Sequence, residues 1–289
     1  MENSDNGGAS TVPQVEIHLP VSVLRPYITF YYFVSAIGPL IDFLYPEWGN
    51  VRFELAGRWH VLMDGDGTNA IGDRLFGPTD RCGRVITEGG RIAGFGMTPL
   101  GWHRLIGSDA NAMANRIVPL GNLFGSALEP VRIALASDAC AVAGTAKFDE
   151  LLCSHLASRP DEDWQVIAVD GALAARPNGV AALAAAAGMS ARTLHRVCLR
   201  AFGFPPKRLL RRQRFLDTLG HVRSAVGDPL RTSLGPDYFD QAHFYRDFRD
   251  FMGMSPRAYF TSSRNLMARA AAAQVAASVT LSFKLPAAA

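Results

Sequence analysis

The chain has 289 residues, 48% of them hydrophobic, so it is long enough for about two domains that each bury a core. No apolar run approaches the roughly 20 residues of a membrane span, and the first residues lack the basic and apolar regions of a signal peptide, so we expect a cytoplasmic protein. The four cysteines include no close pair, which argues against a disulfide framework, a zinc knuckle or a redox motif.

The formal net charge of +3 conceals an asymmetry along the chain. Residues 1–175 carry 12 Lys and Arg against 20 Asp and Glu, whereas residues 176–269 carry 16 Lys and Arg against 6 Asp, a net charge of +10. The basic third is therefore the part of the chain that we expect to bind a polyanion.

The first half predicts strands followed by helices. Residues 1–20 are expected to be a disordered lead-in, because residues 1–13 are polar and rich in Gly, Ser and Asn. The aromatic and β-branched run Ile28–Ile37 predicts a strand. Further strands, separated by Gly, Pro, Asp and Asn turn signals, are predicted at Val51–Leu55, Trp59–Met63, Arg84–Thr87 and Ile92–Met97. Short strands at such spacing predict a small β sandwich or barrel.

After Thr98-Pro99 the pattern becomes helical, with candidate helices at Leu100–Ile106, Leu120–Phe124, Leu128–Ser137 and Lys147–Ala157. We therefore expect an α+β domain over residues 21–158. Its tryptophans, Trp48, Trp59 and Trp102, either line a small-molecule pocket or, as is more typical in a β-rich domain, belong to the core. The charged break Arg159–Asp163 is the predicted linker.

The basic third predicts a helix-turn-helix from spacing alone. A helix near Trp164–Ala174 precedes an Ala-rich helix at Val180–Ala187, a turn at Gly188–Ser190 and a helix at Ala191–Phe202. Ser190 is placed to cap the last of these. Leu194, Val197 and Ala201 would then face the core and leave the basic side chains outside.

A second amphipathic helix begins after Asp240, which stands where an N-cap is needed. Phe244, Phe248 and Phe251 fall at i, i+4 and i+7, so they share one face. The opposite face offers amide, imidazole, phenol and guanidinium groups, which suit the major groove of DNA, where Arg pairs with guanine and Gln with adenine. Gly253 would end this helix, and Ser255-Pro256 would begin the next.

These motifs resemble the AraC/XylS family of bacterial transcription regulators. D-Q-A-H-F-x-R-x-F followed by G-M-S-P-x-x-Y is similar to its second helix-turn-helix, and L-A-A-A-A-G-M-S-x-R-T-L-x-R is similar to its first. G-F-P-P-K-R-L-L-R-R-Q-R-F resembles the connecting helix. Landmarks such as Leu24–Tyr27, Phe76–Thr79 and Gly94–Gly101 resemble an uncharacterised N-terminal domain found in front of such DNA-binding domains.

The resemblance implies an all-α C-terminal domain with two helix-turn-helix motifs at residues 163–269, followed by a disordered or frayed tail at 270–289. Two such units would contact groove segments about one DNA turn, roughly 34 Å, apart. The implied partner is double-stranded promoter DNA. The resemblance also implies that the domain over residues 21–158 senses a signal or dimerises. RNA polymerase, a small-molecule effector and a second copy of the chain are further expected partners.

The resemblance and the helical periodicity together give the candidate DNA contacts, and no catalytic residue, cofactor or metal site is expected. The candidates are Arg192, Thr193, His195, Arg196, Arg200, Lys207, Arg208, Gln241, Ala242, His243, Tyr245, Arg246 and Arg249.

The sequence departs from the family pattern where Gly235 and Pro236 fall in the supporting helix of the second motif. Both residues should shorten that helix. An enzyme with an appended DNA-binding domain, such as a DNA-repair methyltransferase, is the alternative function. It would need a reactive cysteine, for which Cys82, with Arg81 and Arg84 nearby, is the candidate.

Overall fold

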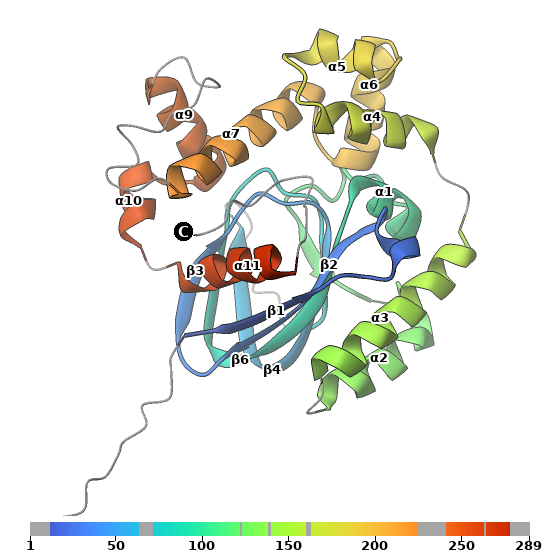
Figure 1. Cartoon of the computed structure of the whole chain (residues 1–289), viewed down its shortest axis with the longest axis vertical. Coiled ribbons are helices and arrows are strands. Elements are labelled where there is room, and N and C mark those ends of the chain that lie inside the picture. Colours follow the sequence, from blue (N-terminus) through green and yellow to red (C-terminus); the bar gives the residue numbers. More distant parts are fainter. Residues whose placement is uncertain are drawn as a thin grey trace, which may run out of the picture.

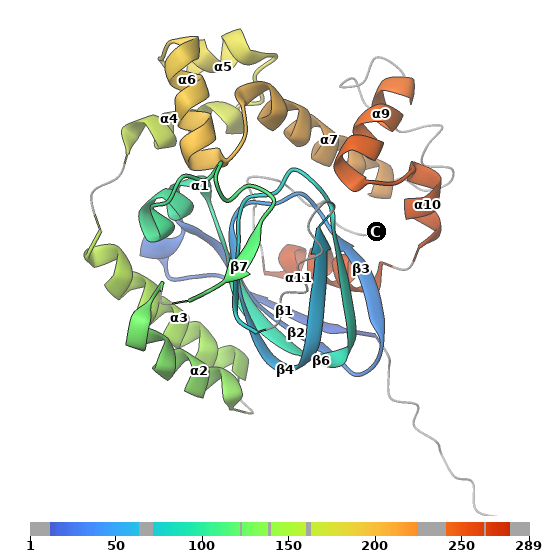
Figure 2. The same cartoon turned by 180° about the vertical axis from the view of Figure 1, so that it is seen from behind.

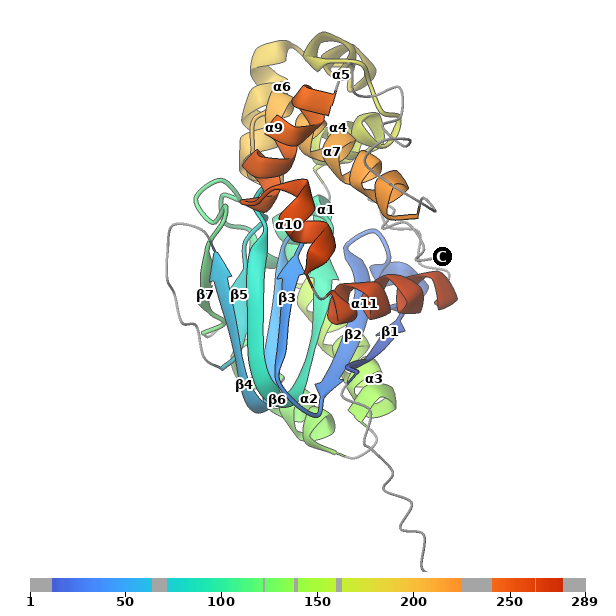
Figure 3. The ribbon, with the colours of Figure 1, turned by 90° about the vertical axis from the view of Figure 1, so that its left-hand side faces the viewer.

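The computed structural model describes residues 12–63, 72–121, 123–137, 140–159, 163–224, 241–262 and 264–277. A curved antiparallel sheet forms the centre of the N-terminal half, and most helices of the C-terminal half lie across one end of it (Figures 1 and 3). The predicted succession of an α+β region and a helical region is therefore confirmed. Within the described ranges, no helix has the length and apolar character needed to cross a membrane.

In the part of the chain that the structure describes, seven strands form a single sheet in the order β1-β2-β6-β4-β5-β7, with β3 paired to β6, and each pairing is antiparallel. The strands are β1 (Gln14–His18), β2 (Ile28–Ala36), β3 (Leu40–Leu44), β4 (Asn50–Met63), β5 (Arg74–Phe76), β6 (Gly83–Met97) and β7 (Ile117–Pro119).

Two long strands, β4 and β6, each replace a pair of short strands that the sequence predicts. Gly57 and Gly90 lie opposite each other where the register of the β4–β6 ladder shifts. Both have positive φ angles, and a Cβ atom on Gly90 would stand 2.0 Å from the carbonyl oxygen of Ala56. The prediction of separate strands was wrong here because these glycines form bulges within continuous strands instead of turns.

The sheet is apolar on both faces because neighbouring residues of β2 pack into different clusters. Tyr31 and Phe33 face a core shared with the helices, whereas Tyr32 and Val34 face a second core. Phe148 fills the first core, and the centroid of its ring lies 5.1 Å from that of Tyr31. The continuous aromatic run of β2 thus reflects burial on both sides.

Helices cover the first of these faces (Figure 2). α1 (Pro99–Gly101) begins at Thr98, whose hydroxyl accepts a hydrogen bond of 2.9 Å from the amide of Gly101. The other N-terminal helices and short turns are η1 (Ser22–Leu24), η2 (Trp102–Ile106), η3 (Gly125–Ala127), α2 (Leu128–Ala136) and α3 (Cys140–Ala157).

The C-terminal helices form two groups joined by the long helix α7 (Pro206–Ser224), as Figure 1 shows. The first group is α4 (Trp164–Ala174), α5 (Val180–Ala186), α6 (Ala191–Val197) and η4 (Cys198–Phe202). The second group is α9 (Gln241–Met252) and α10 (Pro256–Thr261), after which α11 (Asn265–Ala276) returns to the sheet.

Arg212 of α7 is fully buried between the two halves of the chain. Its Nη1 donates a hydrogen bond of 2.7 Å to the carbonyl oxygen of Thr79, and its guanidinium lies over the ring of Trp48, 3.7 Å from the centroid. Burial lowers the pKa of Arg212 to about 9. The helix that joins the two C-terminal groups therefore rests on the N-terminal half through a buried cation.

Each helix group is also joined to the N-terminal half by its own hydrogen bonds. The amide of Ala110 donates to the carbonyl oxygen of Arg200 at 2.8 Å, which holds the first group. The amide of Cys82 donates to the carbonyl oxygen of Phe251 at 2.7 Å, which holds the second. The two helix groups are thus fixed to different points of the N-terminal half.

Glu47 lies beside the buried guanidinium of Arg212. Its burial makes the free energy of unfolding depend on pH. Burial raises the pKa of the Glu47 carboxyl to about 7, while the guanidinium groups of Arg52 and Arg212 oppose the rise. The folded chain therefore holds the Glu47 proton more tightly than the unfolded chain does. As pH rises from about 4.5 to about 7, the free energy of unfolding should fall, because the charged carboxylate is disfavoured in the fold.

We expect Glu47→Gln to flatten this fall. At about pH 8 the variant should be more stable than the wild type by about 1–2 kcal/mol, and at about pH 5 the two should be nearly equal. Urea unfolding at both pH values measures the difference, and Glu88→Gln, at an exposed position, is the matched control. A pH dependence as steep in Glu47→Gln as in the wild type would contradict the assignment.

The two expected disordered segments were partly wrong. In the lead-in, Val15 and Ile17 alternate with polar residues, and this period of two forms β1, which pairs with β2. In the tail, α11 extends to Ala276 and packs against β1 and β3. Leu266, Ala271 and Gln274 lie on its buried face, so one leucine, one alanine and one glutamine are buried there in place of a continuous apolar stripe.

Candidate nucleic-acid interface

The first unit consists of α5, a turn and α6. Gly188 adopts a φ of 64° at the end of α5, and Ser190 then caps α6, its hydroxyl accepting from the amide of Thr193 at 3.1 Å. Leu194 and Val197 are buried in the core. The opposite face of α6 is left to solvent and exposes Arg192, His195 and Arg196.

The second unit is organised around an aromatic cluster. Phe244, Phe248 and Phe251 of α9 are buried around Phe215 of α7, whose ring centroid lies 5.0 Å from that of Phe251. Rings of this size dominate the burial energy of a small helical unit. The outer face of α9 exposes Ala242, Arg246 and Arg249, so the amphipathic pattern predicted from the sequence is confirmed.

Part of the second unit lies outside the described residues. Residues 225–240, which include Gly235, Pro236 and the predicted cap Asp240, are outside the described residues. The side chain of Gln241 is also not described. After α9 the described chain continues as predicted: Gly253 follows the helix, and Ser255 caps α10 by accepting from the amide of Ala258 at 3.2 Å.

The described candidate contacts fall into three groups. Arg192, His195, Arg196, Lys207, Ala242, Arg246 and Arg249 are exposed; Thr193, His243 and Tyr245 are half-buried; Arg200 and Arg208 are held by carboxylates. The open faces of α6 and α9 therefore carry six of these candidates, and α7 carries one more, Lys207.

Arg200 and Arg208 differ from the expectation because each is engaged by acidic residues. Arg200 pairs with Asp163 at the start of α4. The Nε of Arg208 donates to Asp80 at 2.5 Å, its Nη1 pairs with Asp250, and its guanidinium lies over Phe251. Arg200 therefore joins η4 to the start of α4, and Arg208 joins α7 to α9. These ion pairs give no support to a DNA contact from either arginine.

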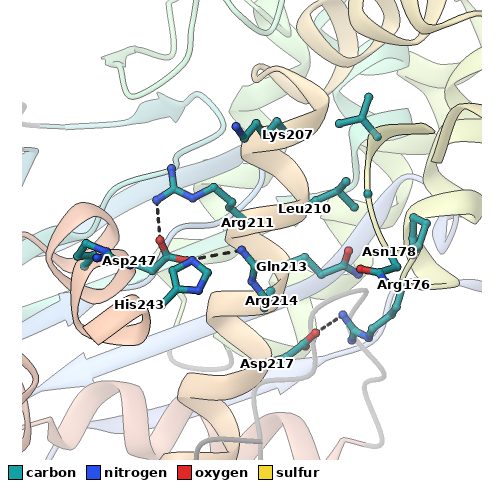
Figure 4. Close-up of a pocket in the computed structure, with 14 residues that line it drawn as sticks. Arg176, Asn178, Lys207, Leu210, Arg211, Gln213, Arg214, Asp217, His243 and Asp247 are labelled. Carbon is teal, nitrogen blue, oxygen red and sulfur yellow. Dashed lines mark hydrogen bonds and ion pairs between the residues drawn. The ribbon is translucent and has the colours of Figure 1, made fainter. Parts of the chain in front are cut away.

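A groove of about 870 Å³ separates the two units (Figure 4). It runs along α7 between α9 and the segment that joins α4 to α5. Three of the candidate contacts, Lys207, His243 and Arg246, lie along it. Its other charged residues are Arg176, Arg211, Arg214, Asp217 and Asp247.

Ion pairs hold the walls of this groove, as Figure 4 shows. Asp247 of α9 is almost fully buried and accepts from Nη2 of Arg211 at 2.6 Å, with Nη2 of Arg214 at 3.9 Å. On the opposite side of the groove, Arg176, which follows α4, forms an ion pair with Asp217 of α7. Because cations outnumber carboxylates, the groove is electropositive and can accept an anion such as a phosphate.

Sequence reasoning missed Arg176, Arg211 and Arg214 as groove residues. A signal was present for two of them, since Lys207, Arg211 and Arg214 stand at i, i+4 and i+7 and therefore share a face of α7. Arg176 gives no such signal, because its place beside α7 depends on the path of the chain after α4.

Residues 183–262 match the family model of a helix-turn-helix domain. Residues 183–262 are an AraC-type helix-turn-helix domain. The match begins in α5 and ends just after α10, so the AraC-type domain includes both units and α7. The resemblance drawn from the sequence is confirmed for this domain, and the chain thus carries a DNA-binding domain of the type found in transcription regulators.

Similar solved structures include ToxT and CuxR. ToxT from Vibrio cholerae has 9% identity and a TM-score of 0.41, with 86% of this chain and 96% of that chain covered. The AraC-like transcriptional activator CuxR has 14% identity and a TM-score of 0.24, with 71% of this chain and 86% of that chain covered. No curated protein matches the chain.

Proposed function

We propose that the chain is a sequence-specific transcription regulator that contacts two neighbouring major-groove segments of promoter DNA with α6 and α9. The observation that carries this proposal is the pair of exposed basic faces, Arg192 and Arg196 on α6 and Arg246 and Arg249 on α9, on either side of an electropositive groove. Guanidinium groups suit both guanine edges and phosphates. The groove between the units suits the phosphate backbone that separates two groove segments.

Regulation through the N-terminal half is part of the proposal. The buried contact of Arg212 with Thr79 and Trp48 supports it, because any change in the sheet near these residues acts directly on the helix that joins the two units. A second copy of the chain and RNA polymerase are proposed as further partners. Exposed apolar side chains on α2 and α3, Ile133 and Val142, offer a surface for a second copy.

The enzyme alternative is less well supported. A reactive cysteine needs an accessible thiolate, whereas Cys82 is buried, and its backbone is hydrogen-bonded to Phe251 of the second unit. We therefore infer that Cys82 packs the contact between sheet and helices and that the chain acts on gene expression in the cytoplasm without an enzymatic step.

The two exposed faces should differ in what they contribute to binding. Arg196 lies on the open face of α6, so we expect Arg196→Ala to change base preference at one position and to cost about 1–3 kcal/mol, or about 5–150-fold, at the preferred site. Arg246 lines the groove beside Lys207 and His243, so Arg246→Ala should weaken binding evenly across sequences. Selection from a randomised-site library with each variant measures both effects.

The matched control is Arg58→Ala, which removes an exposed arginine from β4, outside the AraC-type domain. Its affinity and preference should equal those of the wild type. If the selection finds no preferred sequence for the wild type, sequence-specific recognition is wrong. If Arg246→Ala shifts base preference as sharply as Arg196→Ala, the assignment of Arg246 to phosphate contact is wrong.

A further inference from the structure

His243 lies where the groove between the two units meets α9, next to a buried carboxylate (Figure 4). Its Nε2 atom is 4.0 Å from Oδ2 of Asp247, which stands one helical turn further along α9. The His243 side chain is 33% exposed, whereas Asp247 is almost fully buried. The imidazole ring therefore lies between a fixed anion in the protein and the open groove.

The charged groups that line the groove around His243 come from α9, from α7 and from the segment after α4. Among the described residues they are Arg246 and Asp247 of α9, Lys207, Arg211, Arg214 and Asp217 of α7, and Arg176. Arg211 and Arg214 share the carboxylate of Asp247, and Arg176 pairs with Asp217. Both of these carboxylates are thus engaged by arginines, and the groove keeps a surplus of positive charge.

An anion that enters the groove changes the balance of charge at His243. Lys207 and Arg246 line the same groove and are exposed, so they can draw in a phosphate of the DNA backbone. Histidine is the side chain that ordinarily gains or loses its charge between about pH 5 and pH 8. A phosphate beside the ring favours the charged form, which can donate a charge-assisted hydrogen bond to it.

We propose that His243 takes up a proton when a DNA phosphate enters the groove, so that the affinity for DNA falls as the pH rises from about 6 to about 8. The complex then holds one more proton than the free chain, and raising the pH favours the free chain. Lysine and arginine keep their positive charge in this range, so His243 is the pH-dependent phosphate ligand of the groove. This inference deepens the proposed function and rests on it.

Fluorescence anisotropy with the full chain and a mixed-sequence DNA duplex tests the proposal. The wild type should bind about tenfold more tightly at about pH 6 than at about pH 8. His243→Gln cannot take up the proton, so its affinity should stay at the weaker level at both pH values. His243→Lys carries a positive charge at both pH values, so its affinity should stay near the tighter level.

The matched control is His221→Gln, which removes an exposed imidazole from α7 outside the groove and should keep the pH dependence of the wild type. Glu47, whose pKa is about 7, is present in every variant, so the difference between wild type and His243→Gln isolates the imidazole. Equal affinity of the wild type at the two pH values would overturn the proposal. A pH dependence as steep in His243→Gln as in the wild type would do the same.

Sulfate, a tetrahedral anion that does not titrate in this pH range, tests the proton uptake without DNA. In the full chain it should move the midpoint of the His243 ring titration to higher pH, as followed by NMR of the ring protons and assigned with His243→Gln. An unmoved midpoint would overturn the proposal whatever the result with DNA. A moved midpoint in a chain that binds no DNA would contradict the proposed function instead.

Discussion

Raising the salt concentration from about 50 to about 200 mM should weaken DNA binding by about a thousandfold, because each neutralised phosphate releases counterions. The size of this loss of affinity follows from the number of basic side chains that are exposed to solvent. Many arginines of the AraC-type domain, such as Arg208 and Arg211, are engaged by carboxylates. The exposed cations in its described part are Arg192, Arg196, Lys207, Arg246, Arg249 and Arg257.

About five to six phosphate contacts are therefore expected, fewer than the net charge of +10 would suggest. Fluorescence anisotropy across a salt series measures the slope. Lys207→Ala should reduce the slope by about one, since the residue is exposed beside the groove. Arg208→Ala, on the same helix but paired with Asp80, should leave the slope unchanged. A salt-independent affinity would contradict DNA binding through this basic surface.

Replacing Arg212 with alanine should lower the free energy of unfolding by about 3–5 kcal/mol. The guanidinium is fully buried, donates to the carbonyl oxygen of Thr79 at 2.7 Å and to that of Glu47 at 3.4 Å, and packs on Trp48. Its removal leaves both carbonyl groups and the Glu47 carboxyl without that cation and opens a cavity between α7 and the sheet.

Urea unfolding followed by tryptophan fluorescence measures this loss. Lys207→Ala on the same helix is exposed and should change stability by less than about 0.5 kcal/mol. Arg212→Lys keeps the charge but not the planar donor fork, so we expect an intermediate loss. A loss for Arg212→Ala as small as that of Lys207→Ala would mean that α7 is held to the sheet by other contacts.

Periodicity predicted what each helix of the AraC-type domain buries. Phe244, Phe248 and Phe251 could be assigned to a core from spacing because i, i+4 and i+7 share a face, and the structure buries all three. The open faces of α6 and α9 followed from the same argument. Local patterns suffice here because the partners of a helix face are set mainly by its own repeat.

Contacts between distant parts of the chain could not be predicted in this way. Asp80, which engages Arg208, is 128 residues away, and nothing in the sequence pairs them. The helix α11 was missed because half of its residues are alanines, which give little contrast between the two faces of a helix. Gly57 and Gly90 resemble turn signals in sequence, and only the ladder between β4 and β6 reveals them as bulges.

The return of α11 to the sheet has a consequence for synthesis on the ribosome. β1 and β3, against which α11 packs, emerge early, whereas Leu266, which belongs to the same core, emerges more than 200 residues after β3 ends at Leu44. At about 5–20 residues per second, this interval lasts roughly 10–40 s. During that time the apolar surface beneath α11 is uncovered on the nascent chain, which makes this sheet face a natural substrate for chaperones that bind exposed strands.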